Sequence, residues 1–168
     1  MKKKAFAVVL TLLLWLGAFS AYAVLAAPTN DGSGESTPLE VPAEGLAFEN
    51  GTIYGIRKAW FQEVNPDKND LFLSVTIPAA IDGQPVTNIA FEAFTTAYTS
   101  EKKAKNAVTY NDKLGLFYLT AADFTNAVHL KTIQKQAFNN SAYLSGTVDL
   151  SNTALISIDK MADRKSVV

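Results

Sequence analysis

Hydrophobic positions occupy one long block at the N-terminus and then recur in short, spaced groups. Residues 5–27 carry no charged side chain, and they follow three consecutive lysines. A basic start, an apolar stretch and then small residues are the order of a secretory signal peptide. We assign residues 1–26 to this segment, although cleavage after Ala23 fits nearly as well as cleavage after Ala26. We expect the rest of the chain to be exported, that is, secreted or held at the cell surface.

The alternative for this segment is an uncleaved membrane anchor, since about 20 apolar residues are enough to span a bilayer. We favour cleavage because the last third of the block is weakly apolar and rich in small residues. After it, residues 27–45 are mostly small and turn-forming, and they offer a core almost nothing to bury. This composition predicts a flexible, disordered linker.

The next apolar groups predict a hairpin and a short helix over residues 46–69. Asn50-Gly51 separates two short apolar segments, and this pair accepts the positive φ angles of a type I′ turn. Beyond it, Ile56, Trp60 and Val64 share one helical face. The Asn-Pro pair that follows ends the helix. We expect these elements to cap the chain that follows, with Trp60 anchored in the core.

Residues 70–162 contain three stretches with a common spacing. In each, a strand-like segment precedes an isoleucine that is followed four residues later by alanine, and in two of them phenylalanine comes next. Ile133 and Ile158 are 25 residues apart, which is within the period of leucine-rich repeats. The longer spacing from Ile89 to Ile133 reflects an inserted polar run. The repeated positions are Ile77, Ile89, Ala93, Phe94, Phe124, Ile133, Ala137, Phe138, Leu150, Ile158 and Ala162.

This periodicity predicts an irregular α/β solenoid of leucine-rich repeats with short parallel strands. One repeat cannot bury its apolar edge alone, so neighbouring repeats must cover it. We expect Phe94 and Phe138 to fill the interior below their own repeats. The predicted ladders of stacked side chains are Ile77, Phe124 and Leu150 in one, and Ile89, Ile133 and Ile158 in the other.

The pattern resembles the BspA-like, or treponemal, branch of leucine-rich repeats, which read I-P-x-x-V and then I-G-x-x-A-F. Residues 76–78, 89–94 and 133–138 carry the likeness. Ala90 and Gln134 depart from it, because the family usually has glycine at those positions. The resemblance implies an exported protein that is displayed on a surface and binds proteins or adheres to cells, without catalysis.

The third repeat breaks off after Ala162, where phenylalanine is expected. Residues 163–168 read Asp-Arg-Lys-Ser-Val-Val, which resembles the translation of a common sequencing adapter. We interpret these residues as a non-native tail and the chain as a truncated N-terminal fragment. The alternative is a genuine, unusual C-terminus.

Composition narrows the possible functions without naming one. The chain has no cysteine and one histidine, His129. It therefore lacks the residues for disulfides, thiolate zinc sites and multi-histidine metal sites. Without residues 1–26, twelve basic and sixteen acidic residues remain, and this balance disfavours nucleic acid and anionic membranes as partners. Membrane contact is expected only through an uncleaved signal segment.

The sequence contains no motif that indicates a catalytic, cofactor-binding or metal site. His129 is interpreted as a surface or structural residue. Asp123 and Asp149, at equivalent repeat positions, are interpreted as solvated or turn residues, with a cation-binding stripe as the alternative. We therefore expect a non-enzymatic module that binds a protein or cell-surface ligand through the solenoid face. The alternatives are a targeting region of a larger secreted enzyme or cell-wall protein whose C-terminal part is missing, and, less favoured, a secreted hydrolase.

Overall fold

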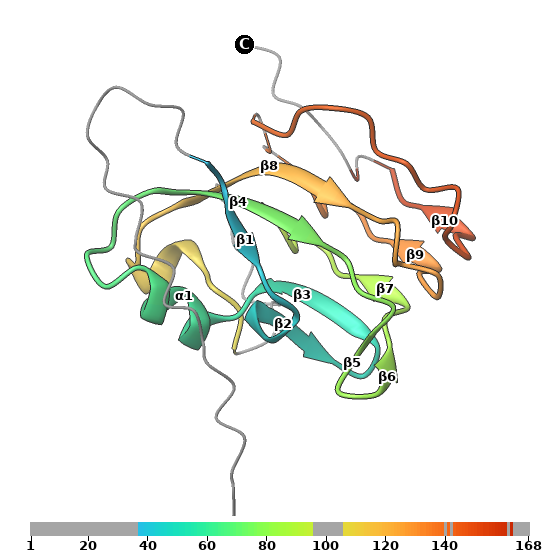
Figure 1. Ribbon diagram of the computed structural model, residues 1–168, viewed down its shortest axis with the longest axis horizontal. Helices are drawn as coiled ribbons and strands as arrows, with labels where there is room; N and C mark the ends of the chain where they lie inside the picture. The colour runs from blue at the N-terminus through green and yellow to red at the C-terminus, as the bar shows by residue number, and fades with distance from the viewer. Residues whose placement is uncertain (1–36, 96–105, 140, 142, 161, 163–168) are drawn as a thin grey trace, which may run out of the picture.

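The computed structural model describes residues 37–95, 106–139, 141, 143–160 and 162. The predicted signal peptide, most of the predicted linker and the tail at 163–168 lie outside the described residues. The described chain is mostly β-sheet with one α-helix (Figure 1). Its elements are β1 (Leu39–Val41), the 3-10 helix η1 (Ala43–Gly45), β2 (Leu46–Glu49), β3 (Thr52–Ile56), α1 (Lys58–Val64), β4 (Leu71–Thr76), β5 (Ala80–Ile81), β6 (Gln84–Pro85), β7 (Asn88–Ile89), the 3-10 helix η2 (Tyr110–Asp112), β8 (Phe117–Asp123), β9 (Thr132–Ile133) and β10 (Ser157–Ile158).

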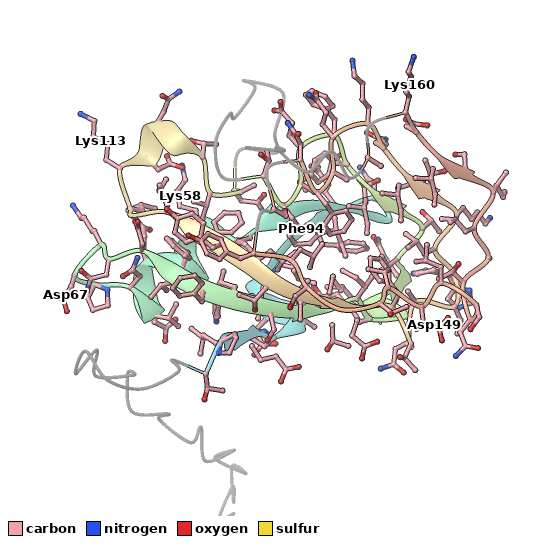
Figure 2. The ribbon with its side chains drawn as sticks, turned by 90° about the horizontal axis from the view of Figure 1, so that it is seen from above. Lys58, Asp67, Phe94, Lys113, Asp149 and Lys160 are labelled. Atoms are coloured by element: carbon pink, nitrogen blue, oxygen red, sulfur yellow. The ribbon has the colours of Figure 1, made fainter. Side chains whose placement is uncertain are left out.

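These strands form two larger sheets and one small hairpin. Strands β1, β4 and β8 make a three-stranded parallel sheet, and β10, β9, β7, β3 and β2 make a five-stranded sheet in that order. The five-stranded sheet is parallel except where β2 and β3 pair antiparallel. Strands β5 and β6 pair only with each other. The hydrophobic core lies between the two larger sheets, where Figure 2 places Phe94.

The predicted leucine-rich-repeat solenoid is wrong, and the described chain has a mixed α/β fold. The prediction placed only short parallel strands in residues 70–162, whereas the strands β5 and β6 pair antiparallel there, and the described strands are divided among three sheets. Local chemistry explains part of this division. Pro78 has no N–H with which to extend β4. Asp82 and Gly83, both at positive φ, then turn the chain through the β5–β6 hairpin before β7 begins.

The repeated isoleucines occupy equivalent positions in the five-stranded sheet. Each strand from β3 through β7 and β9 to β10 pairs its isoleucine with that of the next strand. These residues are Ile53, Ile89, Ile133 and Ile158. The first three side chains are buried. Ile158 is 53% exposed, because β10 is the outermost strand of the described sheet.

The repeated phenylalanines fill the space between the sheets. The rings of Phe94 and Phe138 are buried and stacked, with centroids 5.3 Å apart and an interplanar angle of 15°. Their backbone amides make equivalent hydrogen bonds at 2.8 Å, from Phe94 to the Ala137 carbonyl and from Phe138 to the Ala162 carbonyl. The same spacing in the sequence therefore produces the same backbone contacts, and each phenylalanine packs on the next.

The N-terminal part of the fold begins earlier than the sequence predicts. Strand β1 lies inside the predicted linker of residues 27–45 and pairs with residues 73–75 of β4. Val41 is only 2% exposed. The linker prediction is therefore wrong from residue 39 onward. The apolar partners of β1 are on a strand far away in the sequence, so the local composition does not reveal them.

The predicted hairpin and helix are confirmed, except that Ile56, predicted on the helical face, is the last residue of β3. Strands β2 and β3 pair antiparallel on either side of Asn50 and Gly51, whose φ angles of 49° and 76° suit a type I′ turn. The helix α1 ends at Val64, and Asn65 of the predicted Asn-Pro stop is its C-cap residue. Trp60 is half-buried and packs against the core.

An ion pair joins α1 to η2, two segments that are far apart in the sequence. Lys58 donates to the carboxylate of Asp112, which also accepts bonds from the amide and hydroxyl of Thr109. Burial raises the pKa of Asp112, but the hydrogen bonds from Lys58 and Thr109 outweigh it and lower the pKa below its ordinary value of 3.8.

We expect Asp112→Asn to lower the urea midpoint of unfolding at neutral pH and to differ less from the wild type below about pH 4. A carboxyl group whose pKa is lowered by folding stabilises the protein above its unfolded pKa. This contribution is lost as the pH falls through the folded pKa. The control is Glu49→Gln, an exposed carboxylate on β2, whose midpoint should match the wild type at both pH values. An equal loss of stability in Asp112→Asn at both pH values would contradict the ion-pair account.

Candidate binding surface

The parallel sheet of β1, β4 and β8 has one face toward the core and one face outward. On β4, Leu73 and Val75 are buried, whereas Phe72 is exposed and Ser74 and Thr76 are half-buried. Alternate residues of a strand point to opposite faces of its sheet. Phe72, Ser74 and Thr76 therefore belong to the face that turns away from the core, which we call the outer face.

Three aromatic side chains gather on the outer face. Phe72 of β4, Tyr118 of β8 and Tyr143, which follows β9, contact one another pairwise, with ring centroids 5.6, 5.3 and 5.0 Å apart. Phe72 is 36% exposed and Tyr143 is 53% exposed. Single exposed aromatic residues are ordinary, but three in mutual contact make a continuous apolar patch. We call these three residues the aromatic cluster.

Asp70 places a carboxylate beside the aromatic cluster. Its Oδ2 accepts a hydrogen bond from the Tyr118 hydroxyl at 3.3 Å, and its Oδ1 accepts one from the Leu116 amide at 3.0 Å. Burial raises the pKa of Tyr118, and the negative charge of Asp70 and the hydrogen bond to it raise the pKa further. The Tyr118 hydroxyl is therefore a neutral donor at physiological pH, oriented toward the carboxylate.

The side chain of Asn65 holds the segment that carries Asp70. Asn65 is 4% exposed, and its Nδ2 donates to the carbonyl oxygens of Asn69 at 2.7 Å and Leu114 at 2.9 Å. Its Oδ1 accepts from the Asn69 amide at 2.9 Å. Gly115, at a φ of +87°, lies so close to the Asn69 carbonyl that a Cβ atom there would overlap it. These contacts join the segment that precedes β4 to the segment that precedes β8. They therefore position Asp70, which comes directly before β4.

The sheet that carries the outer face is acidic. Within β1, β4 and β8, the charged residues are Glu40 and Asp123, and both are acidic. In Figure 2, Lys113 and Lys160 project from the side of the molecule opposite to Asp149. Within these three strands, the charged side chains are therefore all negative.

Asp123 and Asp149 serve as turn residues, which was the favoured interpretation of the sequence. The Asp123 carboxylate accepts bonds from the hydroxyl and amide of Thr125 at 2.6 and 2.8 Å, and Asp149 accepts one from the Ser151 amide at 2.8 Å. Hydrogen bonds from Thr125 lower the pKa of Asp123, and those from Ser151 lower the pKa of Asp149. Within the described ranges, no group of three or more His, Asp or Glu residues is placed to hold a metal ion.

The residues singled out from the sequence lie away from the aromatic cluster. The repeated positions are buried in the core, except for half-buried Leu150 and exposed Ile158. His129 is exposed. One sequence signal for the cluster existed, because a strand through Leu71, Phe72 and Leu73 must place Phe72 on the face opposite to its neighbours.

Comparison with known proteins gave no match, whether to a family model, to a curated protein or to a solved structure. Among the described residues, no helix has the length and apolar character needed to cross a bilayer.

Proposed function

We propose that this protein is an exported, non-catalytic binding module that attaches to a protein or cell-surface ligand through its outer face. The observation that carries the proposal is the aromatic cluster, in which exposed Phe72 and Tyr143 pack against half-buried Tyr118 next to the Asp70 carboxylate. Tyrosine and other aromatic residues dominate binding hot spots, because they bury a large area and can also form hydrogen bonds.

Two features of the sequence support export and surface binding. The order of charged, apolar and small residues in 1–26 is that of a signal peptide. The likeness of residues 89–94 and 133–138 to BspA-like sequences points to the same surface role, without that group's solenoid. The proposal includes no cofactor and no nucleic-acid partner.

The rigidity of the outer face supports binding by a preformed surface. Phe72 and Tyr118 belong to paired strands, with Phe72 directly opposite Tyr118 in the register of β4 and β8. Tyr143 is held nearby, since Leu144 donates to the Ser141 carbonyl at 2.9 Å and Ser145 to the Thr120 carbonyl at 3.1 Å. A surface that is ordered before binding loses less conformational entropy on association.

The purified protein should bind at least one member of a panel of immobilised extracellular proteins, intact epithelial cells and intact bacterial cells. We expect the double variant Phe72→Ser, Tyr143→Ser to bind about tenfold less tightly, because it removes two exposed members of the aromatic cluster. The matched control is Ile156→Ser, which removes a side chain that is 81% exposed beside the other sheet. Circular dichroism checks that each variant is folded. Binding that is lost in the control but kept in the double variant would contradict the proposal, and so would no binding to the whole panel.

A further inference from the structure

We infer that the ligand of the outer face is an arginine-bearing, basic segment of a partner protein. This inference rests on the proposed function, because it names the chemistry of the partner for the same surface. It is carried by three observations: the exposed rings of Phe72 and Tyr143, the carboxylate beside the aromatic cluster, and the absence of Lys and Arg from the three strands of the sheet.

The Asp70 carboxylate is next to Tyr118, and the Tyr143 ring packs against the Tyr118 ring. The Asp70 carboxylate lies 3.3 Å from the Tyr118 hydroxyl, and the Tyr118 ring centroid is 5.0 Å from that of Tyr143. A cation over an aromatic face within about 6 Å of the centroid is attracted by the ring. Each oxygen of Asp70 uses one hydrogen bond within the protein, and a carboxylate oxygen has a second lone pair to offer.

The charged side chains on the sheet itself favour the same kind of partner. Glu40 and Asp123 are exposed on the sheet, and Asp149 is exposed on the chain that follows β9. Complementary potentials speed the encounter with a basic segment, and like charges disfavour an acidic one. Phe72 and Tyr143 add apolar area that a purely ionic site lacks.

Arginine suits this site better than lysine. Its planar guanidinium stacks on an aromatic ring and can still donate to a carboxylate from its edge, and it is more weakly hydrated than an ammonium group. Lysine offers a compact charge that holds its water more strongly. A preference for arginine over lysine therefore separates stacking on the aromatic cluster from simple attraction to an acidic face.

The test measures binding of three fluorescently labelled peptides to the purified full chain by anisotropy. The peptides are Gly-Ser spaced and carry three arginines, three lysines or three glutamates. We expect the arginine peptide to bind about two- to fivefold more tightly than the lysine peptide, and the glutamate peptide not to bind. Asp70→Asn keeps an acceptor for the Leu116 amide but removes the charge, and it should weaken arginine-peptide binding by a similar factor. Tyr143→Ser should weaken it too, whereas the control Glu49→Gln, on β2 of the other sheet, should bind like the wild type.

Two results would overturn the inference. One is equal affinity for the arginine and lysine peptides, and the other is unchanged binding by folded Asp70→Asn. Another outcome is binding to a surface from which a soluble glycan, but not the arginine peptide, displaces the protein. In that case the partner is a carbohydrate, and only this inference fails. If the arginine peptide binds but no surface on the panel does, the proposed surface attachment fails while the chemistry of the face stands.

Discussion

Replacing Phe94 by Ala is expected to lower the free energy of unfolding by about 3–5 kcal/mol. The Phe94 ring is fully buried, stacks on Phe138 at 5.3 Å and lies between the two larger sheets (Figure 2). Truncation removes this apolar contact and leaves a cavity that the surrounding strands cannot fill. The measurement is a urea titration followed by circular dichroism.

The matched control for this prediction is Phe72→Ala, the same substitution at an exposed member of the aromatic cluster. Phe72 is 36% exposed, so its truncation leaves no closed cavity, and we expect a loss of about 1 kcal/mol. The two variants then separate the core phenylalanine from the surface phenylalanine. A loss below about 1 kcal/mol in Phe94→Ala would show that the core tolerates the cavity, contrary to the packing described above.

Replacing Asn65 by Leu is expected to lower the free energy of unfolding by about 2–5 kcal/mol. The substitution keeps similar bulk but removes the bonds to the Asn69 amide and to the carbonyls of Asn69 and Leu114. A buried polar group that loses its partner costs about 1–3 kcal/mol. Asn65→Asp tests the donor alone, because a carboxylate cannot donate to two carbonyl oxygens; we expect it to be destabilising as well.

The control for Asn65 is Asn152→Leu, at an exposed asparagine, which should change stability by no more than about 0.5 kcal/mol. Because Asn65 positions the segment that carries Asp70, Asn65→Leu should also weaken binding at the outer face under conditions where the variant is still folded. Wild-type stability in both Asn65 variants would show that this buried side chain is dispensable. Wild-type ligand affinity in a folded Asn65 variant would show that the hydrogen bonds of Asn65 are not needed to position Asp70.

Local elements of the fold are predictable because their causes are local. The type I′ turn needs two residues that accept positive φ, and Asn50-Gly51 supplies both. The helix α1 follows from its apolar face and ends before Pro66, whose ring disfavours helical geometry in the residue before it. Ile89, Ile133 and Ile158 share the four-residue step to alanine, and they pair in register in the five-stranded sheet.

Neither the arrangement of the sheets nor the candidate site follows from local pattern. The repeat pattern places Ile77 and Ile89 in different ladders, but it does not say that β1 joins the sheet of β4 or that β2 and β3 join the sheet of β7. The pairing of β1 with β4 depends on a partner more than thirty residues away, as the match of Leu39 with Leu73 illustrates. The composition of residues 27–45 therefore predicts disorder where a strand forms.

By itself, the sequence determined the spacing of the core positions, the asparagine–glycine turn, the helix and the acidic balance of residues 27–168. Only the tertiary structure decided which strands pair in each of the two larger sheets and that three aromatic rings meet on one outer face. The physical reason is the range of the interactions. A turn or a helix end depends on neighbouring residues, whereas Phe72, Tyr118 and Tyr143 are brought together by strand pairing and by the chain that runs beside β8.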